Sequence, residues 1–363
     1  MSSAEDTVTE AEAGPERSSF ARRARMLRGP LRLLALVFVV QVFVFPQLGG
    51  ARKAAGLLAG LDYRWVAAAV VAELAAWGAY AQLTRVLLPQ PPALSLRSSA
   101  SLVMTTLAVS HVLPGGQAAA SAMAFQRLRD RGVDGSAAGL TLAAQSFGSA
   151  VVLNIILWFA LLVSIPASGF QPIYATAAAA GAAVLAVVGL AVLGLSQGEA
   201  LLTRVVRAAA RRVPRLDEER VGVALAKAAD QLRELRSDPR RVAIAAGWAT
   251  LNWLLDAAAL WFFLAAFGQR AGVAGLLVAF GLAFVLAAIP LTPGGLGVVE
   301  ATLASLLVGF GTPRAEAALA IAGYRLLNFW LPIPLGALTY LYGGFRGALA
   351  ERETAPSGPD SGG

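Results

Sequence analysis

The sequence contains no cysteine and only one histidine, His111. These absences exclude disulfides, thiolate metal sites and thiol nucleophiles, and they argue against a histidine-based metal site, so no cofactor is expected. Charged residues are also scarce, at 14% of the 363 residues, whereas an ordinary soluble domain carries about 25%. A chain with so little charge and 57% hydrophobic residues is typical of a polytopic membrane protein.

The apolar stretches lack the alternation of a membrane-spanning strand. They are continuous and rich in alanine and leucine, and several reach the roughly 20 residues that a helix needs to cross the hydrocarbon core of a bilayer. A transmembrane β-barrel would alternate apolar and polar residues, so we expect an all-α polytopic membrane helical bundle instead. Six full spans are predicted, at residues 31–49, 64–88, 137–165, 173–196, 241–268 and 316–343.

Three segments lack the composition of a span. Residues 1–29 and 346–363 are predicted to be disordered cytoplasmic tails on either side of a transmembrane domain at residues 30–345. Residues 197–240 are dense in arginine, with apolar residues recurring among the charges of the stretch 216–236. This cytoplasmic connector is either an amphipathic helix on the membrane surface or a solvated helix.

Two further apolar segments, 93–126 and 272–310, are each interrupted by a proline and two glycines. The breaks are Pro114-Gly115-Gly116 and, after Thr292, Pro293-Gly294-Gly295. Proline removes a backbone donor, and glycine permits positive φ, so each segment should break into a re-entrant or paired helix. Freed backbone groups at membrane depth survive only when they are buried in protein or line a wet cavity. Two such breaks in corresponding halves indicate a transporter's substrate site.

The net charge of +8 comes from arginines in loops beside the spans, which favours the positive-inside rule over a nucleic-acid interface. Arginines flank both ends of segment 93–126, so this segment should open to the cytoplasm, and segment 272–310 should open to the outside. The result is an inverted repeat with both termini cytoplasmic. Arg52, Lys53 and Arg64 on the outer loop conflict with this orientation.

Ionisable side chains inside the spans are the strongest candidates for a site. An ionised residue at the centre of a membrane helix costs about 2.5–3.5 kcal/mol on insertion scales, so it needs a partner or a wet cavity. Asp256, Glu300 and Arg325 are expected to gather near the second break, either as a substrate site or as a structural ion pair. Glu73 is a fourth candidate, with snorkelling to the outer interface as the alternative.

The breaks offer a second kind of contact. Backbone N–H groups left free at a helix start favour an anion such as a lipid phosphate, so the glycines of both breaks are candidate headgroup contacts. The alternative is a tight turn without a ligand. Arg127 and Arg131 either bind headgroups at the cytoplasmic surface or only follow the positive-inside rule. His111 is more typical of a packed or capping residue than of a catalyst.

The second break lies within Pro290-Leu-Thr-Pro-Gly-Gly-Leu-Gly-Val-Val-Glu300, which resembles the signature of the lysylphosphatidylglycerol synthase transmembrane-region family. Leu113-Pro-Gly-Gly and the Arg325 segment Gly-Tyr-Arg-Leu-Leu-Asn-Phe-Trp are similar to further motifs of that family. The resemblance implies a flippase-like module for phospholipids or for isoprenoid-linked and glycosylated lipids, in a bacterial-type plasma (inner) membrane. The chain ends soon after its last span, so we expect no aminoacyl-transferase domain.

These observations lead to one main hypothesis and two alternatives. The main hypothesis is a lipid translocase, rather than an enzyme, that moves a phospholipid or an isoprenoid- or sugar-linked headgroup across the membrane by alternating access. Its partners would be membrane lipids and no nucleic acid. The alternatives are an integral-membrane enzyme that transfers glycosyl or aminoacyl groups, and a membrane partner of a separate lipid-modifying enzyme. No nucleotide motif or metal cluster in the sequence supports the enzyme.

Overall fold

A computed structural model describes residues 56–89, 94–113, 116–168, 175–176, 178–186, 238–288 and 292–339. Every regular element in these ranges is a helix, which confirms the all-α prediction. The predicted span 31–49 and both tails lie outside the described residues. Nearly all of the connector 197–240 and about half of the predicted span 173–196 lie outside them as well.

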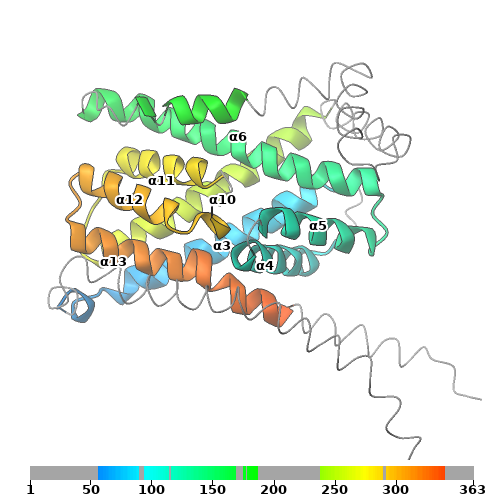
Figure 1. Cartoon of the computed structure of the whole chain (residues 1–363), viewed down its shortest axis with the longest axis horizontal. Helices are drawn as coiled ribbons and strands as arrows, with labels where there is room; N and C mark the ends of the chain where they lie inside the picture. Colours follow the sequence, from blue (N-terminus) through cyan, green and yellow to red (C-terminus); the bar gives the residue numbers. More distant parts are fainter. Residues whose placement is uncertain are drawn as a thin grey trace, which may run out of the picture.

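In the described part of the chain, four helices are long and apolar enough to cross a membrane. They are α3 (Tyr63–Leu87), α6 (Gly135–Ser168), α10 (Pro239–Ala266) and the helix that starts as α13 (Arg314–Arg325) and continues to Thr339. The first three begin and end within about three residues of the predicted spans, because long continuous apolar runs mark membrane helices well. The chain is thus a polytopic helical membrane protein (Figure 1).

Helices α3 and α10 lie antiparallel and are joined at both ends. At one end, the Asp62 backbone N–H, just before α3, donates to the last carbonyl of α10, that of Ala266 (3.2 Å). At the other end, the Arg241 guanidinium donates to three carbonyls at the end of α3, those of Val86, Leu87 and Leu88, at 2.8, 3.1 and 2.6 Å. The last carbonyls of a helix have no partner within the helix, so this arginine satisfies groups that lipid could not.

Both interrupted segments form a pair of short helices. The first consists of α4 (Leu96–Val112) and α5 (Gly116–Arg129), and the second consists of α11 (Val273–Ala287), a tight turn η3 (Pro293–Gly295) and α12 (Val298–Gly309). The arms have 12 to 17 residues, and at about 1.5 Å per residue they are shorter than a hydrocarbon core of about 30 Å. Their lengths favour re-entrant hairpins over paired full spans.

The two hairpins enter the bundle from opposite ends, and their tips meet in the middle (Figure 1). The hairpin α4–α5 opens at the end where α3 finishes and α10 starts, whereas α11–α12 opens where α10 finishes. The turn η3 of the second hairpin contacts both helices of the first. This arrangement is the one that the inverted repeat predicts.

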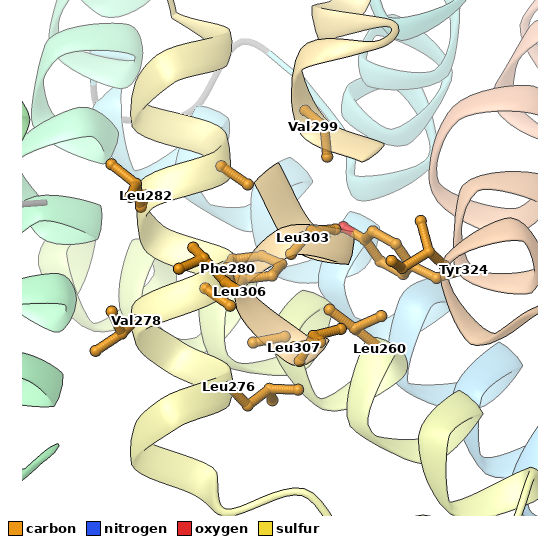
Figure 2. Packing of buried hydrophobic residues seen from close by; sticks show 14 of the residues in the cluster. Leu260, Leu276, Val278, Phe280, Leu282, Val299, Leu303, Leu306, Leu307 and Tyr324 are labelled. Atoms are coloured by element: carbon orange, nitrogen blue, oxygen red, sulfur yellow. The ribbon is translucent and has the colours of Figure 1, made fainter. Parts of the chain in front are cut away.

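The second hairpin is held by an apolar core between α6, α10, α11 and α12 (Figure 2). Phe280 on α11, Leu303 on α12 and Leu260 on α10 are fully buried in it. Gly281 of α11 lets Leu157 of α6 pack closely, since an added Cβ would lie 3.1 Å from the Leu157 Cβ. Lipid tails are as apolar as leucine, so the close fit of these side chains, rather than exclusion of water, holds the hairpin in place.

The last helix contains a wide turn, η4, at Leu326–Trp330. The Leu331 N–H donates to the carbonyl of Leu326, five residues earlier, at 2.9 Å. Pro332 follows directly and explains this turn, because its ring would clash with the carbonyl four residues before it and it has no N–H to donate. Wide turns of this kind are common at functional sites, and this one positions Asn328 and Phe329.

Candidate functional site

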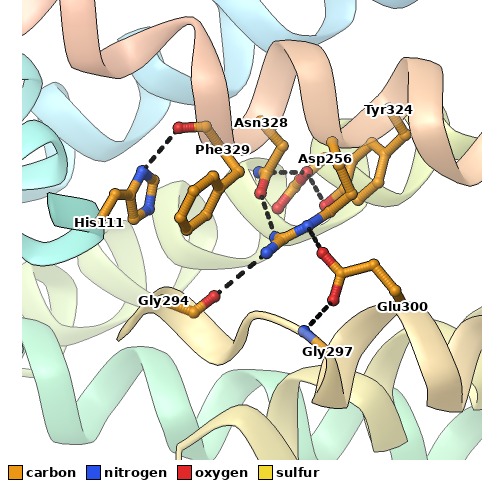
Figure 3. A network of polar contacts seen from close by, with 9 residues as sticks. His111, Asp256, Gly294, Gly297, Glu300, Tyr324, Asn328 and Phe329 are labelled. Carbon is orange, nitrogen blue, oxygen red and sulfur yellow. Dashed lines mark hydrogen bonds and ion pairs between the residues drawn. The ribbon is translucent and has the colours of Figure 1, made fainter. Parts of the chain in front are cut away.

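A buried ion pair between Arg325 and Glu300 lies beside the second break (Figure 3). The Arg325 Nε donates to Glu300 Oε1 at 2.6 Å, and the two side chains are only 1% and 6% exposed. The other oxygen, Glu300 Oε2, accepts from the Gly297 N–H at 2.6 Å and so caps the start of α12. One carboxylate therefore both neutralises the arginine and fixes the helix that follows the break.

Arg325 also contacts the break itself and the wide turn. One terminal guanidinium nitrogen donates to the Gly294 carbonyl at 3.3 Å, and the other to Asn328 Oδ1 at 3.5 Å. The guanidinium carbon lies 4.6 Å from the centre of the Phe329 ring, which adds a cation–π contact. The two long hydrogen bonds are much weaker than the ion pair, so they are the contacts that a ligand would exchange most easily.

A pair of acids from α3 and α10 lies on the other side of Asn328. Asp256 Oδ1 accepts from the Tyr324 hydroxyl at 2.7 Å and from Asn328 Nδ2 at 3.1 Å. The same Asn328 nitrogen donates to Glu73 Oε1 at 3.2 Å, and the carboxyl groups of Glu73 and Asp256 lie within hydrogen-bonding reach of each other. Glu73 is only 2% exposed, so its alternative placement at the outer interface is wrong.

The first hairpin reaches the same cluster through His111, at the end of α4. The His111 Nδ1 lies 2.9 Å from the Phe329 carbonyl oxygen, and the two rings stack with centroids 4.3 Å apart. A carbonyl only accepts, so Nδ1 is the protonated nitrogen of this packed histidine. A Cβ on Gly294 would collide with the Phe329 ring and lie 3.0 Å from the His111 ring. The two hairpin tips therefore touch through these three residues.

Two of the glycine amides at the breaks are bonded within the turns. The Gly116 N–H donates to the Leu113 carbonyl at 2.8 Å, and the Gly295 N–H donates to that of Thr292 at 3.3 Å. These two amides therefore serve tight turns, whereas the role of the other break glycines as headgroup contacts stays a prediction. Pro114 and Gly115 lie outside the described residues. At Gly294 it is the carbonyl that meets the cationic side chain.

The second break is exposed, although it lies where the hairpin tips meet. Thr292, Gly294 and Gly297 are exposed and Pro293 is half-buried, whereas Gly295 is buried. Irregular backbone that is open at membrane depth must face water or protein rather than lipid. This side of the turn is therefore the part of the cluster that a polar ligand would reach first.

The surface arginines of the first hairpin differ from each other. Arg127 points inward, and its guanidinium donates to Thr105 Oγ1 on α4 at 3.1 Å, next to Thr339 of the last helix. Arg131 is exposed and donates to the Arg127 carbonyl at 3.0 Å. Only Arg131 has the placement expected of a headgroup contact at the surface. In the described ranges, no three histidine or carboxylate side chains converge as a metal site.

Asn328, Tyr324 and Phe329 are the members of the cluster that the sequence did not single out. Each flanks the predicted Arg325 in an otherwise apolar span, and Asn328 comes four residues before Pro332. A polar amide inside a membrane span next to a helix-distorting proline is the signal that would have indicated it. Phe329 carries no such signal, because its role depends on contacts from two other elements.

Four candidate spanning helices and two opposed broken hairpins around a buried charged cluster define a polytopic integral membrane protein. The family described as the lysylphosphatidylglycerol synthase TM region matches residues 32–336, and the chain belongs to this family. The earlier resemblance is thereby confirmed over most of the chain.

Two curated relatives are similar over a shorter stretch. A UPF0104 membrane protein of Methanothermobacter thermautotrophicus is 32% identical over 88 residues, which is 24% of this chain and 26% of that protein. The inner membrane protein YbhN of Escherichia coli (strain K12) is 31% identical over 93 residues, 26% of this chain and 28% of the relative. These alignments therefore span about a quarter of each relative's length.

Proposed function

We propose that this protein is a lipid translocase, which moves the phosphate-bearing headgroup of a membrane lipid across the plasma membrane, and that it acts as a transporter rather than an enzyme. One observation carries the proposal: two broken hairpins from opposite ends of the bundle meet at the buried Arg325–Glu300 pair. Broken membrane helices that converge on charged side chains are the usual construction of a transporter's substrate site.

Arg325 is the group in this cluster best suited to a phosphate. A guanidinium presents a planar fork of donors that matches two phosphate oxygens at once. Its contacts with the Gly294 carbonyl and with Asn328, at 3.3 and 3.5 Å, are the ones a phosphate would replace. The short bond to Glu300 would remain and hold the guanidinium in place.

The two hairpins supply the two access routes. One hairpin opens toward each end of the bundle, so small movements of either tip against Phe329 would open the cluster to one side at a time. The headgroup would cross through this polar centre while the acyl or isoprenoid chains stay in the surrounding lipid. The substrate is thus a phospholipid or an isoprenoid- or sugar-linked lipid phosphate.

Reconstituted protein tests the proposal directly. Full-length protein in proteoliposomes would be given fluorescent phospholipids and a polyprenyl phosphate, and movement between leaflets would be followed by quenching from outside. We expect movement of at least one lipid class with wild type and its loss with Arg325→Ala. Arg270→Ala, which removes an exposed arginine at the far end of α10, is the matched control. Folded wild-type protein that moves none of these lipids would refute the proposal.

A further inference from the structure

The charges buried in the described part of the chain do not balance. The buried acids are Glu73, Asp256, Glu300 and Glu316, whereas Arg325 and His111 are the buried basic residues. Arg325 makes its short contact with Glu300, and His111 lies beyond the Phe329 ring. Glu73 and Asp256 therefore share a buried site in which neither has a short contact with a basic side chain of the described ranges. Two ionised carboxylates side by side in such a site would repel each other strongly.

One oxygen of the acid pair has no hydrogen-bond donor in the described part of the chain. Asn328 Nδ2 donates a hydrogen bond to one oxygen of each acid. The Tyr324 hydroxyl donates a second hydrogen bond to Asp256. Glu73 Oε2, in contrast, is buried and meets no hydrogen-bond donor among the described residues, although the Asp256 carboxyl group is within reach of the Glu73 side chain. Two carboxyl groups can hydrogen-bond to each other only if one of them carries a proton. A single proton on the pair would supply the missing donor and remove the repulsion.

We propose that Glu73 and Asp256 share one proton and that its release and uptake couple lipid movement to the proton gradient across the membrane. The coupling rests on the proposed function, whereas the shared proton does not. In the release step, a carboxyl O–H bond breaks, the proton passes to water entering the cluster, and two carboxylates remain. In the reverse step, one carboxylate takes up a proton from the opposite side.

The wide turn links the two events. Asn328 contacts both acids and also accepts a hydrogen bond from Arg325, so a headgroup that draws Arg325 away disturbs the bridge between the acids. Loss of the Asn328 hydrogen bonds leaves Glu73 and Asp256 with fewer donors and makes the two carboxyl groups accessible to water. In the described part of the chain, the charged and titratable groups that face the pair are Tyr324 and Arg325 of the last helix. Glu300 of α12 lies beyond Arg325, and His111 of α4 lies beyond Phe329.

Infrared spectroscopy of the full-length protein in lipid nanodiscs tests the shared proton without any transport. A protonated buried carboxyl group gives a C=O stretching band that shifts in heavy water. We expect such a band at neutral pH in wild type and its loss in Glu73→Gln and in Asp256→Asn. Glu316→Gln, a change of another buried acid at the far end of α13, should leave the band in place.

A second variant distinguishes loss of the shared proton from misfolding. Asn328→Ala keeps both acids and removes their common donor, so the band should persist at a shifted frequency. A wild-type spectrum without a band that depends on Glu73 and Asp256 would overturn the shared proton, and with it the coupling.

Transport under a pH gradient tests the coupling. With one proton moved per lipid, a gradient of one pH unit should change the distribution of lipid between leaflets by up to about tenfold in wild type. Glu73→Gln should abolish this response. If protein that shows the carboxyl band moves lipid to the same distribution with and without the gradient, the coupling is refuted and the proposed translocase is not. Absence of lipid movement altogether would refute the translocase, and the infrared result would still decide the shared proton.

Discussion

Gly294 occupies a position in the cluster where no side chain fits. Its φ is +53°, and a Cβ would collide with Phe329. Gly297 also has a positive φ, +83°, but nothing lies within 4 Å of its Cβ position. Gly297→Ala should therefore cost backbone strain alone, of about 1–3 kcal/mol, whereas Gly294→Ala adds the clash with Phe329 to the strain of about 1–2 kcal/mol in the left-handed region. We expect the Gly294 variant to have a clearly lower thermal unfolding temperature in detergent; equal temperatures for the two variants would contradict this packing.

The Arg325–Glu300 pair makes a second prediction about single side chains. Removal of one partner leaves a buried charge without its counter-ion, which costs about 3–5 kcal/mol. Arg325→Gln and Glu300→Gln should each lower the unfolding temperature in detergent, and the double variant should be more stable than the sum of the two losses predicts. Strictly additive losses would mean that the two side chains do not interact. Neither variant should move lipid in proteoliposomes.

The sequence indicated the charged members of the cluster but not the residues that connect them. Asp256, Glu300, Arg325 and Glu73 stand out because a charge inside an apolar span is rare and costly. Asn328, in contrast, is placed by a wide turn, and hydrogen bonds between α3, α10 and the last helix define its role. Contacts of this kind depend on the packing of distant segments, which composition and spacing do not reveal.

Among the helices, the wide turn of the last span is the element most open to a test. Pro332→Ala restores a backbone donor and removes the ring clash, so the turn should relax toward a regular helix and rotate Asn328 away from the acids. We expect the variant to fold with normal helix content by circular dichroism and to move lipid more slowly in proteoliposomes. Pro239→Ala is the control, since Pro239 occupies the first turn of α10, where proline causes no strain. An unchanged rate for Pro332→Ala would show that the wide turn has no part in transport.

The helices themselves could be predicted closely, and their breaks as well. Continuous apolar runs fixed the bounds of α3, α6 and α10 to within about three residues. The sequence does not decide whether the interrupted segments cross the membrane, and arms of 12 to 17 residues favour re-entry. The Gly116 and Gly295 amides bond within their turns. The sequence does not reveal this, because a proline and two glycines indicate a break but do not say whether its N–H groups bond within the turn.

The charges at the two ends of the bundle indicate how the protein lies in the membrane. Arginines gather at the end where hairpin α4–α5 opens, and in the described ranges these are Arg85, Arg97, Arg127, Arg129, Arg131, Arg240 and Arg241. The opposite end carries Arg64, Arg270 and Arg314. Positive charge favours the cytoplasmic side, so we expect hairpin α4–α5 to open inward and α11–α12 outward.

The natural absence of cysteine makes this orientation directly measurable in cells, because each single-cysteine variant carries one reactive thiol. Asp130→Cys places it at the arginine-rich end, after α5, and Arg270→Cys places it at the opposite end, before α11; both positions are exposed. A membrane-impermeant maleimide added to intact cells should label the residue-270 variant at once and the residue-130 variant only after permeabilisation. The reverse labelling pattern would mean that the protein has the opposite orientation in the membrane, with hairpin α4–α5 opening outward and α11–α12 inward. Equal labelling of both variants in intact cells would mean a mixture of two orientations, and lipid movement would then have no fixed direction relative to the proton gradient.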